Sequence, residues 1–209
     1  MLLIPTNAQR SYIDSSHETD ALEKNGACQK VDSVDFFEVV RNRRSIRKYR
    51  KEPIQDERLA MIFEAARIAP SAANRQPWRF VVVQDTDRKK ALARAANNQM
   101  FLSEAAAIVA AVADPEVSSR WHEKDAMIAV EHMVLAATAL GYGTCWIGAF
   151  EEDSVKRLLK IPERIRVVAL LPIGVPNEAP ASKPRKELHE IFFGEEWQKP
   201  WAEACISRE

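Results

Sequence analysis

The chain has 209 residues, of which 46% are hydrophobic and 29% are charged, enough for one globular domain with a sizeable core. Thirty basic residues balance thirty acidic ones, so no overall field attracts nucleic acid or an anionic membrane surface. The three cysteines are too widely spaced for a zinc site or a disulfide framework, and no apolar run approaches the ~20 residues of a membrane span. We therefore expect a cytoplasmic protein with no metal site, no nucleic-acid partner and no membrane partner.

Composition along the chain predicts three parts. Residues 1–31 are polar and mixed without a clear period, which is typical of an extension outside the folded core. The main domain is expected over residues 32–193. The tail is expected over residues 194–209. The segment after Pro176 is proline- and charge-rich and carries Phe192, Phe193, Trp197 and Trp201, too much aromatic surface to sit in water alone.

Apolar periodicity and β-branched runs predict the helices and strands of the main domain. Two helices precede the first clear strand, so the chain lacks a strict strand–helix repeat, and we expect an α+β or mixed α/β sheet sandwiched by helices. The expected elements are a helix from a cap at Asp32 or Ser33 to Arg41, a helix from Pro53 and Asp56 to about Ala69, a strand over 80–83, a helix from a cap at Thr86 to about Arg94, a strand over 107–113, an alanine-rich helix over 119–140, a short strand near 145–147, a helix over 154–160 and a strand over 167–171.

Three arginines lie within five positions, at Arg43, Arg44 and Arg47. Guanidinium groups that converge repel one another unless an anion holds them, and the planar fork of arginine suits phosphate. Ser45 adds a hydroxyl donor between them. No glycine-rich phosphate loop is present, so side chains would have to supply the charge, which fits a monophosphate better than a triphosphate. The alternative is a solvated basic turn at the end of the preceding helix.

The loop from Pro70 to Trp78 combines small residues with amide side chains. Small side chains such as Ser71 leave room for a planar ring, and Asn74 and Gln76 can read the edge of a heterocycle. The alternative is turn chemistry alone, because proline, serine and asparagine are common in helix-to-strand connections. Trp78 is expected to pack at the start of the following strand.

Four segments, in this order and spacing, resemble the FMN-dependent nitroreductase family: Arg43-Arg44-Ser45-x-Arg47, the loop from Ala69 to Phe80, the stretch Gly141 to Gly148, and Gly174-x-Pro176 with Lys183-x-Arg185. The family includes flavin reductases, iodotyrosine deiodinase and the enzyme that fragments flavin to make dimethylbenzimidazole. The resemblance covers residues 34–193.

The resemblance implies an α+β fold: a three-layer α/β/α sandwich with a mixed, mostly antiparallel sheet, assembled as an intertwined homodimer with FMN at the interface. It implies an oxidoreductase in which NAD(P)H reduces bound FMN, which then reduces a nitroaromatic, a quinone or a similar small acceptor. No side chain is implied as a catalytic acid or base. We expect the helix over 119–140 at the dimer interface, and the tail along the partner subunit.

The resemblance also implies the residues that bind the flavin. By role, they are Arg43, Arg44 and Ser45 for the phosphate and ribityl groups, Lys183 and Arg185 completing the phosphate site, Arg47 beside flavin N1 and O2, Pro70, Ser71 and Asn74 from the other subunit, and the backbone around Trp146, Ile147 and Gly148 at the N5 edge.

Two alternative functions and the role of one residue stay open. Specialised flavin chemistry is one alternative, either reductive dehalogenation or oxygen-dependent flavin fragmentation; the region from Trp121 to Lys124 has Glu and Lys but no tyrosine matching the Glu-Tyr-Lys lid of deiodinases. A non-catalytic FMN-binding protein is the other. Cys145 next to the expected N5 edge has a redox interpretation and an interpretation as a small buried strand residue. The acceptor and the preference between NADH and NADPH do not follow from the sequence.

Overall fold

The computed structural model describes residues 34–199 and residue 201. Contacts divide the chain into two units, Met1–Asp35 and Phe36–Glu209. Of the first unit only residues 34 and 35 are described, so the expected extension 1–31 and the expected helix cap lie outside the described residues. The expected domain boundaries stay predictions, and the fold belongs to the second unit.

Five strands form one sheet in the order β1-β5-β3-β2, with β4 paired to β5 as well. All of these pairs are antiparallel, and Ser45 adds one parallel bridge to Thr144. The expectation of a mixed, mostly antiparallel sheet is confirmed. The strands are β1 (Tyr49–Arg50), β2 (Trp78–Val83), β3 (Ala107–Ala113), β4 (Gly143–Thr144) and β5 (Arg166–Pro176).

The longest helix of the described residues is α4. Glu123 and Asp125 place negative charge in its first turn, where the helix dipole favours it. Gly141 follows its end at φ 81°, a left-handed conformation that glycine adopts without steric cost. No helix in the described part of the chain is long and apolar enough to span a membrane. The helices are α1 (Phe36–Asn42), α2 (Asp56–Arg67), α3 (Thr86–Ala95), α4 (His122–Ala139) and α5 (Glu152–Leu159), with 3₁₀ turns η3 (Ala72–Asn74), η4 (Met100–Glu104) and η5 (Leu188–Glu190).

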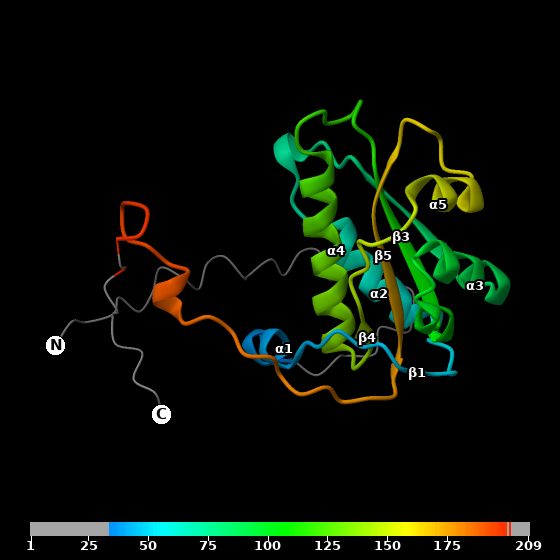
Figure 1. Ribbon diagram of the computed structural model, residues 1–209, viewed down its shortest axis with the longest axis horizontal. Coiled ribbons are helices and arrows are strands. Elements are labelled where there is room, and N and C mark those ends of the chain that lie inside the picture. The colour runs from blue at the N-terminus through cyan, green and yellow to red at the C-terminus, as the bar shows by residue number, and fades with distance from the viewer. Residues whose placement is uncertain (1–33, 200, 202–209) are drawn as a thin grey trace, which may run out of the picture. The chain divides into compact units, whose positions relative to one another are not determined.

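Helices cover both faces of the sheet, with α2 and α4 on one face and α3 and α5 on the other (Figure 1). Strand β3 shows why its sequence is apolar throughout. Its odd-numbered residues from Val109 to Ala113 belong to the core cluster of α2 and α4, and its even-numbered residues from Ile108 to Val112 to the cluster of α3 and α5. Because successive strand residues point to opposite faces, a strand buried on both sides must be apolar at every position. The three-layer α/β/α sandwich is confirmed.

Most element boundaries agree with the sequence predictions, and the strand over 107–113 agrees at both ends. Three predictions need correction and one strand was missed. The strand expected over 167–171 extends to Pro176 in β5. The cap of α3 is Asp85, whose carboxylate accepts the Arg88 N–H, rather than Thr86. The strand expected near 145–147 is β4, two residues earlier, with Ile147 making only an isolated bridge to Leu170. The two-residue strand β1 is too short to give a periodic pattern, and sequence reasoning missed it.

The described part of the C-terminal segment is largely uncovered by its own chain. Residues 181–192 are all exposed. The rings of Phe193 and Trp197 contact each other edge to face with centroids 4.9 Å apart. Even so, Trp197 is 80% exposed. This aromatic surface has no cover within the described residues.

Candidate functional site

A cavity of about 680 Å³ gathers most of the cationic residues that the sequence singled out. It lies between the segment that follows α1 and the segment that follows β5. Its lining contains six cationic side chains and a single carboxylate, that of Glu178. The lining residues include Arg41, Arg43, Arg44, Ser45, Arg47, Glu178, Ser182, Lys183 and Arg185.

The arginine segment is fixed to the sheet by its backbone. The Ile46 N–H donates to the Thr144 carbonyl oxygen over 2.8 Å, beside the parallel bridge of Ser45 to Thr144. The Ile46 side chain is buried against Gly143, where an added Cβ would come within 2.7 Å of it. Anchoring at this one apolar position holds the flanking polar residues Ser45 and Arg47 in place.

Tyr49 fixes the far end of the same segment. Its hydroxyl donates to the Ile46 carbonyl oxygen over 2.8 Å, and its ring is buried against Gly174 of β5. A Cβ on Gly174 would lie 2.7 Å from Tyr49 Cδ1 and 3.2 Å from the backbone of Ala105, so the close approach requires glycine. The spacing Gly174-x-Pro176 therefore reflects packing beneath the arginine segment.

The segment after β5 turns back along the arginine segment. The Asn177 N–H donates to the Lys48 carbonyl oxygen over 2.9 Å, and the Glu178 carboxylate accepts the Arg47 N–H. Arg44 then holds this segment where it crosses, because its Nε donates to the Pro180 carbonyl oxygen over 3.2 Å. These bonds bring Lys183 and Arg185 to the cavity from a part of the chain more than a hundred residues away.

Arg44 does more in the fold than the sequence suggested. Its Nη1 donates to the carbonyl oxygens of Arg41 and Arg43, over 2.6 and 2.9 Å. Together with the bond to Pro180, these contacts fix the guanidinium and use donors that were expected to face a ligand. Arg43, Arg47, Lys183 and Arg185 make no side-chain ion pair within the described residues, so the cavity keeps a strong excess of positive charge.

Buried polar groups lie beneath this positive cavity. Burial raises the pKa of the Cys145 thiol, and the charge of Arg47 and a hydrogen bond with Ser45 oppose the shift without cancelling it. Burial also raises the pKa of Tyr49 far above its usual value, and the charges of Cys145 and Glu178 add to the effect. Both groups therefore stay protonated at neutral pH. A buried, protonated thiol favours the interpretation of Cys145 as a packing residue.

The loop after α2 is held in an unusual backbone conformation. Ala73, Asn74 and Gln76 all have positive φ, at 50°, 53° and 48°. Left-handed backbone at three non-glycine residues stores strain of the kind found at functional sites. The Ser71 hydroxyl accepts the Gln76 N–H over 3.0 Å, and the Asn74 side-chain oxygen accepts a bond from the Gln76 side chain over 3.0 Å. The amide side chains of this loop are exposed.

Asp125 ties the same loop to the first turns of α4. One carboxylate oxygen accepts the Ala72 N–H over 3.2 Å. The other oxygen is buried and has no hydrogen-bond partner in the described residues. Sequence reasoning missed Asp125, although an acidic residue one turn into an otherwise alanine-rich helix was a visible signal.

The expected N5-edge segment follows Cys145, whose thiol is hydrogen-bonded with Ser45 of the cavity lining. The Ile147 N–H donates to Leu170 and its carbonyl oxygen accepts from Leu170, both over 3.0 Å, so its backbone is used within the sheet. Trp146 is partly buried, with its indole N–H donating to Glu131 over 3.1 Å. Gly148 is exposed and faces open space, since an added Cβ would meet nothing within 4 Å. Of the three expected backbone positions, Ile147 is the one with no free group.

Apart from the N5-edge segment, the expected site residues form two groups near opposite ends of α4. The cavity group reaches the sheet through Thr144, just beyond the C-terminal end of α4. The loop group is bound to Asp125, which lies near the N-terminal end of α4. From Asp125 to Ala139 the helix rises by about 21 Å. Pro70, Ser71 and Asn74 do not line the cavity that the arginines line.

Three polar residues of the cavity lining were missed by sequence reasoning: Arg41 in the last turn of α1, and Glu178 and Ser182 after β5. Glu178 and Ser182 belong to an irregular segment, where side-chain direction cannot be inferred from periodicity. The nearby pair Lys183 and Arg185 was the available signal that the segment approaches the arginines.

Comparison with known proteins identifies the family of the chain. The nitroreductase family model matches residues 40–114 and 91–175. A protein of Archaeoglobus fulgidus provisionally named NADH dehydrogenase/NAD(P)H nitroreductase is 36% identical over 151 residues, covering 69% of this chain and 87% of that protein. The Bacillus subtilis FMN reductase [NAD(P)H] is 32% identical over 164 residues, covering 68% of this chain and 66% of its own length.

A solved structure also supports membership of this family. The nitroreductase family protein of Clostridium novyi NT has a TM-score of 0.66 and 37% identity, covering 83% of this chain and 100% of its own. The chain belongs to the nitroreductase family.

Proposed function

We propose that this protein is an FMN-dependent oxidoreductase that takes electrons from NAD(P)H and passes them to a small acceptor such as a quinone or a nitroaromatic compound. The observation that carries the proposal is the cavity in which Arg43, Arg47, Lys183 and Arg185 meet with one opposing carboxylate. The relationship to an FMN reductase supports the choice of cofactor and donor.

The donor set of the cavity fits the phosphate of FMN. A phosphate monoester brings close to two negative charges, which two or three cationic side chains can neutralise. Arg43, Lys183 and Arg185 supply that charge, and Ser45 supplies a neutral hydroxyl donor. Arg44 positions the Pro180 segment so that Lys183 and Arg185 can reach the same ligand. Glu178 limits the positive charge near Arg47 and fixes its backbone.

When bound, FMN would be held by Arg43, Ser45, Lys183 and Arg185 and would supply the redox chemistry between NAD(P)H and the acceptor. The protein holds the ring and sets its electrostatic environment. Arg47 lies where its charge acts on both Cys145 and Tyr49, which places it beside the segment that leads to Gly148. A cation in that position stabilises the negative charge that the ring gains on reduction.

The complete flavin site is proposed to need two copies of the chain. The loop with Ser71 and Asn74 lies near one end of α4, and the arginine cavity lies beyond the other end. An antiparallel pair of subunits brings the loop of one copy to the cavity of the other, as expected for a symmetric interface. The exposed tail, with Phe192 and Trp197, is proposed to pack along the partner subunit.

The test starts with purified protein and the absorption spectrum of its bound flavin. Anaerobic NADH and NADPH should each be tried for bleaching of that spectrum, and a quinone should then restore it. If the protein retains flavin that neither nucleotide bleaches, the protein is a flavin-binding protein and not an NAD(P)H-dependent enzyme. Because the cysteine pattern fits a reducing compartment, we also propose a cytoplasmic location, which fractionation of the source cells tests.

A further inference from the structure

The start of α4 carries an exposed tryptophan next to the loop that is proposed to face the flavin. The Asp125 N–H donates to the Trp121 carbonyl oxygen over 2.8 Å, and the Asp125 carboxylate accepts the Ala72 N–H of that loop over 3.2 Å. Asp125 therefore links Trp121 to Ala72 through one hydrogen bond to each residue. With 38% of its surface exposed, Trp121 is available to a ligand at this position.

Two cationic side chains lie against the indole ring of Trp121. The guanidinium carbon of Arg120 is 5.1 Å from the ring centroid, and the ammonium nitrogen of Lys124 is 4.6 Å from it. Both distances are within the range of cation–π attraction. Both side chains are themselves exposed. The result is a partly exposed indole ring with two positive charges held over it.

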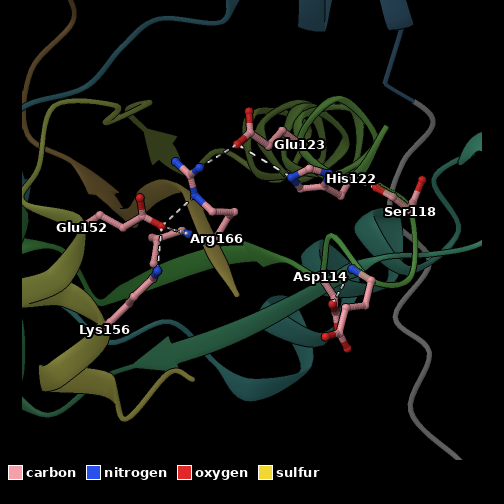
Figure 2. Close-up of polar contacts among 9 residues, drawn as sticks. Asp114, Ser118, His122, Glu123, Glu152, Lys156 and Arg166 are labelled. Carbon is pink, nitrogen blue, oxygen red and sulfur yellow. Dashed lines mark hydrogen bonds and ion pairs between the residues drawn. The ribbon is translucent and has the colours of Figure 1, made fainter. Parts of the chain in front are cut away.

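Nearby acidic residues do not neutralise this charge, because they bind arginines elsewhere. The Glu123 carboxylate lies 4.0 Å from Arg166, at the start of β5, and 3.9 Å from the His122 ring (Figure 2). Asp114 and Glu116 both bind Arg164, over 2.8 and 2.7 Å. Across the described residues, neither Arg120 nor Lys124 has a carboxylate within ion-pair distance.

We propose that Arg120, Trp121 and Lys124 form a specificity surface for planar acceptors that carry a negative charge, such as an aromatic sulfonate or carboxylate. The proposal rests on the proposed function, since it assigns the acceptor class of the same flavin site. The anionic group of such an acceptor interacts with the two cations over the ring, and its flat ring packs against the part of the indole that they leave exposed. A neutral acceptor would use the exposed part of the indole without the charge.

The test compares a neutral naphthoquinone with a sulfonated naphthoquinone as electron acceptors. Measuring wild type and variant with each acceptor cancels the intrinsic reactivity of the compounds. The double variant Arg120→Gln/Lys124→Gln should lower the ratio of kcat/KM for the sulfonated over the neutral acceptor by about fivefold, and the loss should shrink at high salt. The matched control is Lys90→Gln on α3, an exposed cation paired with Asp87, which should leave the ratio unchanged.

Three outcomes would overturn the proposal. One is an unchanged ratio in the double variant. Another is a variant defect confined to flavin reduction by NAD(P)H, because it would assign the cations to the phosphates of the donor. The third is a Trp121→Leu variant that reduces both acceptors as fast as the wild type does.

Failure of the proposed function would appear elsewhere, as wild-type protein whose flavin NAD(P)H does not reduce. The surface is then tested without turnover, by titrating the wild-type tryptophan fluorescence with the sulfonated compound. Weaker binding to the double variant at low salt supports the proposal, and equal binding contradicts it.

Discussion

Arg44 Nε donates to the carbonyl oxygen of Pro180 over 3.2 Å, joining the segment after α1 to the segment after β5. The same guanidinium is held by the carbonyl oxygens of Arg41 and Arg43. One arginine therefore shapes the cavity and brings Lys183 and Arg185 to it. Arg44 therefore has a structural role, whereas Arg43, Arg47, Lys183 and Arg185 keep donors that a ligand can use.

Removing cavity arginines should weaken FMN binding without unfolding the protein. Arg185→Ala loses one charge-assisted contact, worth on the order of 1.5–3 kcal/mol, or roughly tenfold to a hundredfold in Kd. Arg44→Ala should lose at least as much, because the Pro180 segment is also released. Arg44→Lys keeps the charge but not the planar fork, and should resemble Arg44→Ala. Flavin fluorescence titration measures Kd; full flavin retention by an Arg44→Ala/Arg185→Ala double variant would rule out this phosphate site.

Arg47→Gln is expected to bind FMN moderately well and to lower its two-electron potential. Reduction adds negative charge to the ring, and the variant lacks the counter-charge. Spectroelectrochemistry measures the potential, with Arg43→Gln as the control that should change binding more than potential. A potential equal to that of the wild type would place Arg47 away from the N1 side of the flavin.

Gly174→Ala should destabilise the fold by about 1–3 kcal/mol, the usual cost of overpacking. Its new methyl group would press on Tyr49 and on the backbone of Ala105, at 2.7 and 3.2 Å. Gly148→Ala is the matched control, since open space surrounds that position. Urea unfolding of the apoproteins gives the comparison. Equal unfolding free energies for the two variants would show that β5 and the arginine segment separate easily.

Stability should fall in acid partly through Glu152, which joins α5 to the start of β5 (Figure 2). Burial raises the pKa of Glu152, but hydrogen bonds from the Val167 N–H, Arg166 and Lys156 outweigh it, so the net shift is downward. A lowered folded-state pKa means that the unfolded chain binds the proton more readily. The stabilisation is therefore present above the unfolded value of about 4.3 and is lost as pH falls through the lower folded value.

The variant Glu152→Gln isolates this contribution. Its amide oxygen can still accept the Val167 N–H, but it carries no charge for Arg166 or Lys156. We expect lower stability than wild type at pH 7 and a smaller difference at pH 3, measured by urea unfolding at both values. A difference that stays constant with pH would mean that the pKa of Glu152 is the same in the folded and the unfolded protein, and would contradict the downward shift.

The fold followed largely from local pattern. The apolar run 107–113 predicted β3 because both of its faces are covered, and apolar periodicity predicted the long alanine-rich helix that is α4. The family and the three-layer architecture followed from four motifs and are confirmed. The strands that the sequence prediction missed or misplaced are both short. The position of β1, which has two residues, depends on its pairing with β5, and that of β4 depends on the close packing of Gly143 against Ile46.

The candidate site followed from the sequence only in part. The gathering of Arg43, Lys183 and Arg185 in one cavity matches the expected set. The position of Glu178 and the carbonyl contacts of Arg44 depend on how two distant segments cross, and no local pattern records such a crossing. The roles of all these residues toward FMN stay predictions.

The central claim is that each flavin is held by two copies of the chain, and subunit exchange tests it most directly. One variant, Arg43→Ala/Arg185→Ala, removes the cavity cations; the other, Ser71→Ala/Asn74→Ala, removes the loop contacts. Each is expected to be flavin-poor alone. Heterodimers of the two, purified through different affinity tags, combine one intact cavity with one intact loop across the interface. The account predicts that flavin returns to about one of the two sites, calibrated by a wild-type–variant heterodimer. Heterodimers as poor in flavin as their parents would contradict it, because cavity and loop would then serve the same flavin from the same chain.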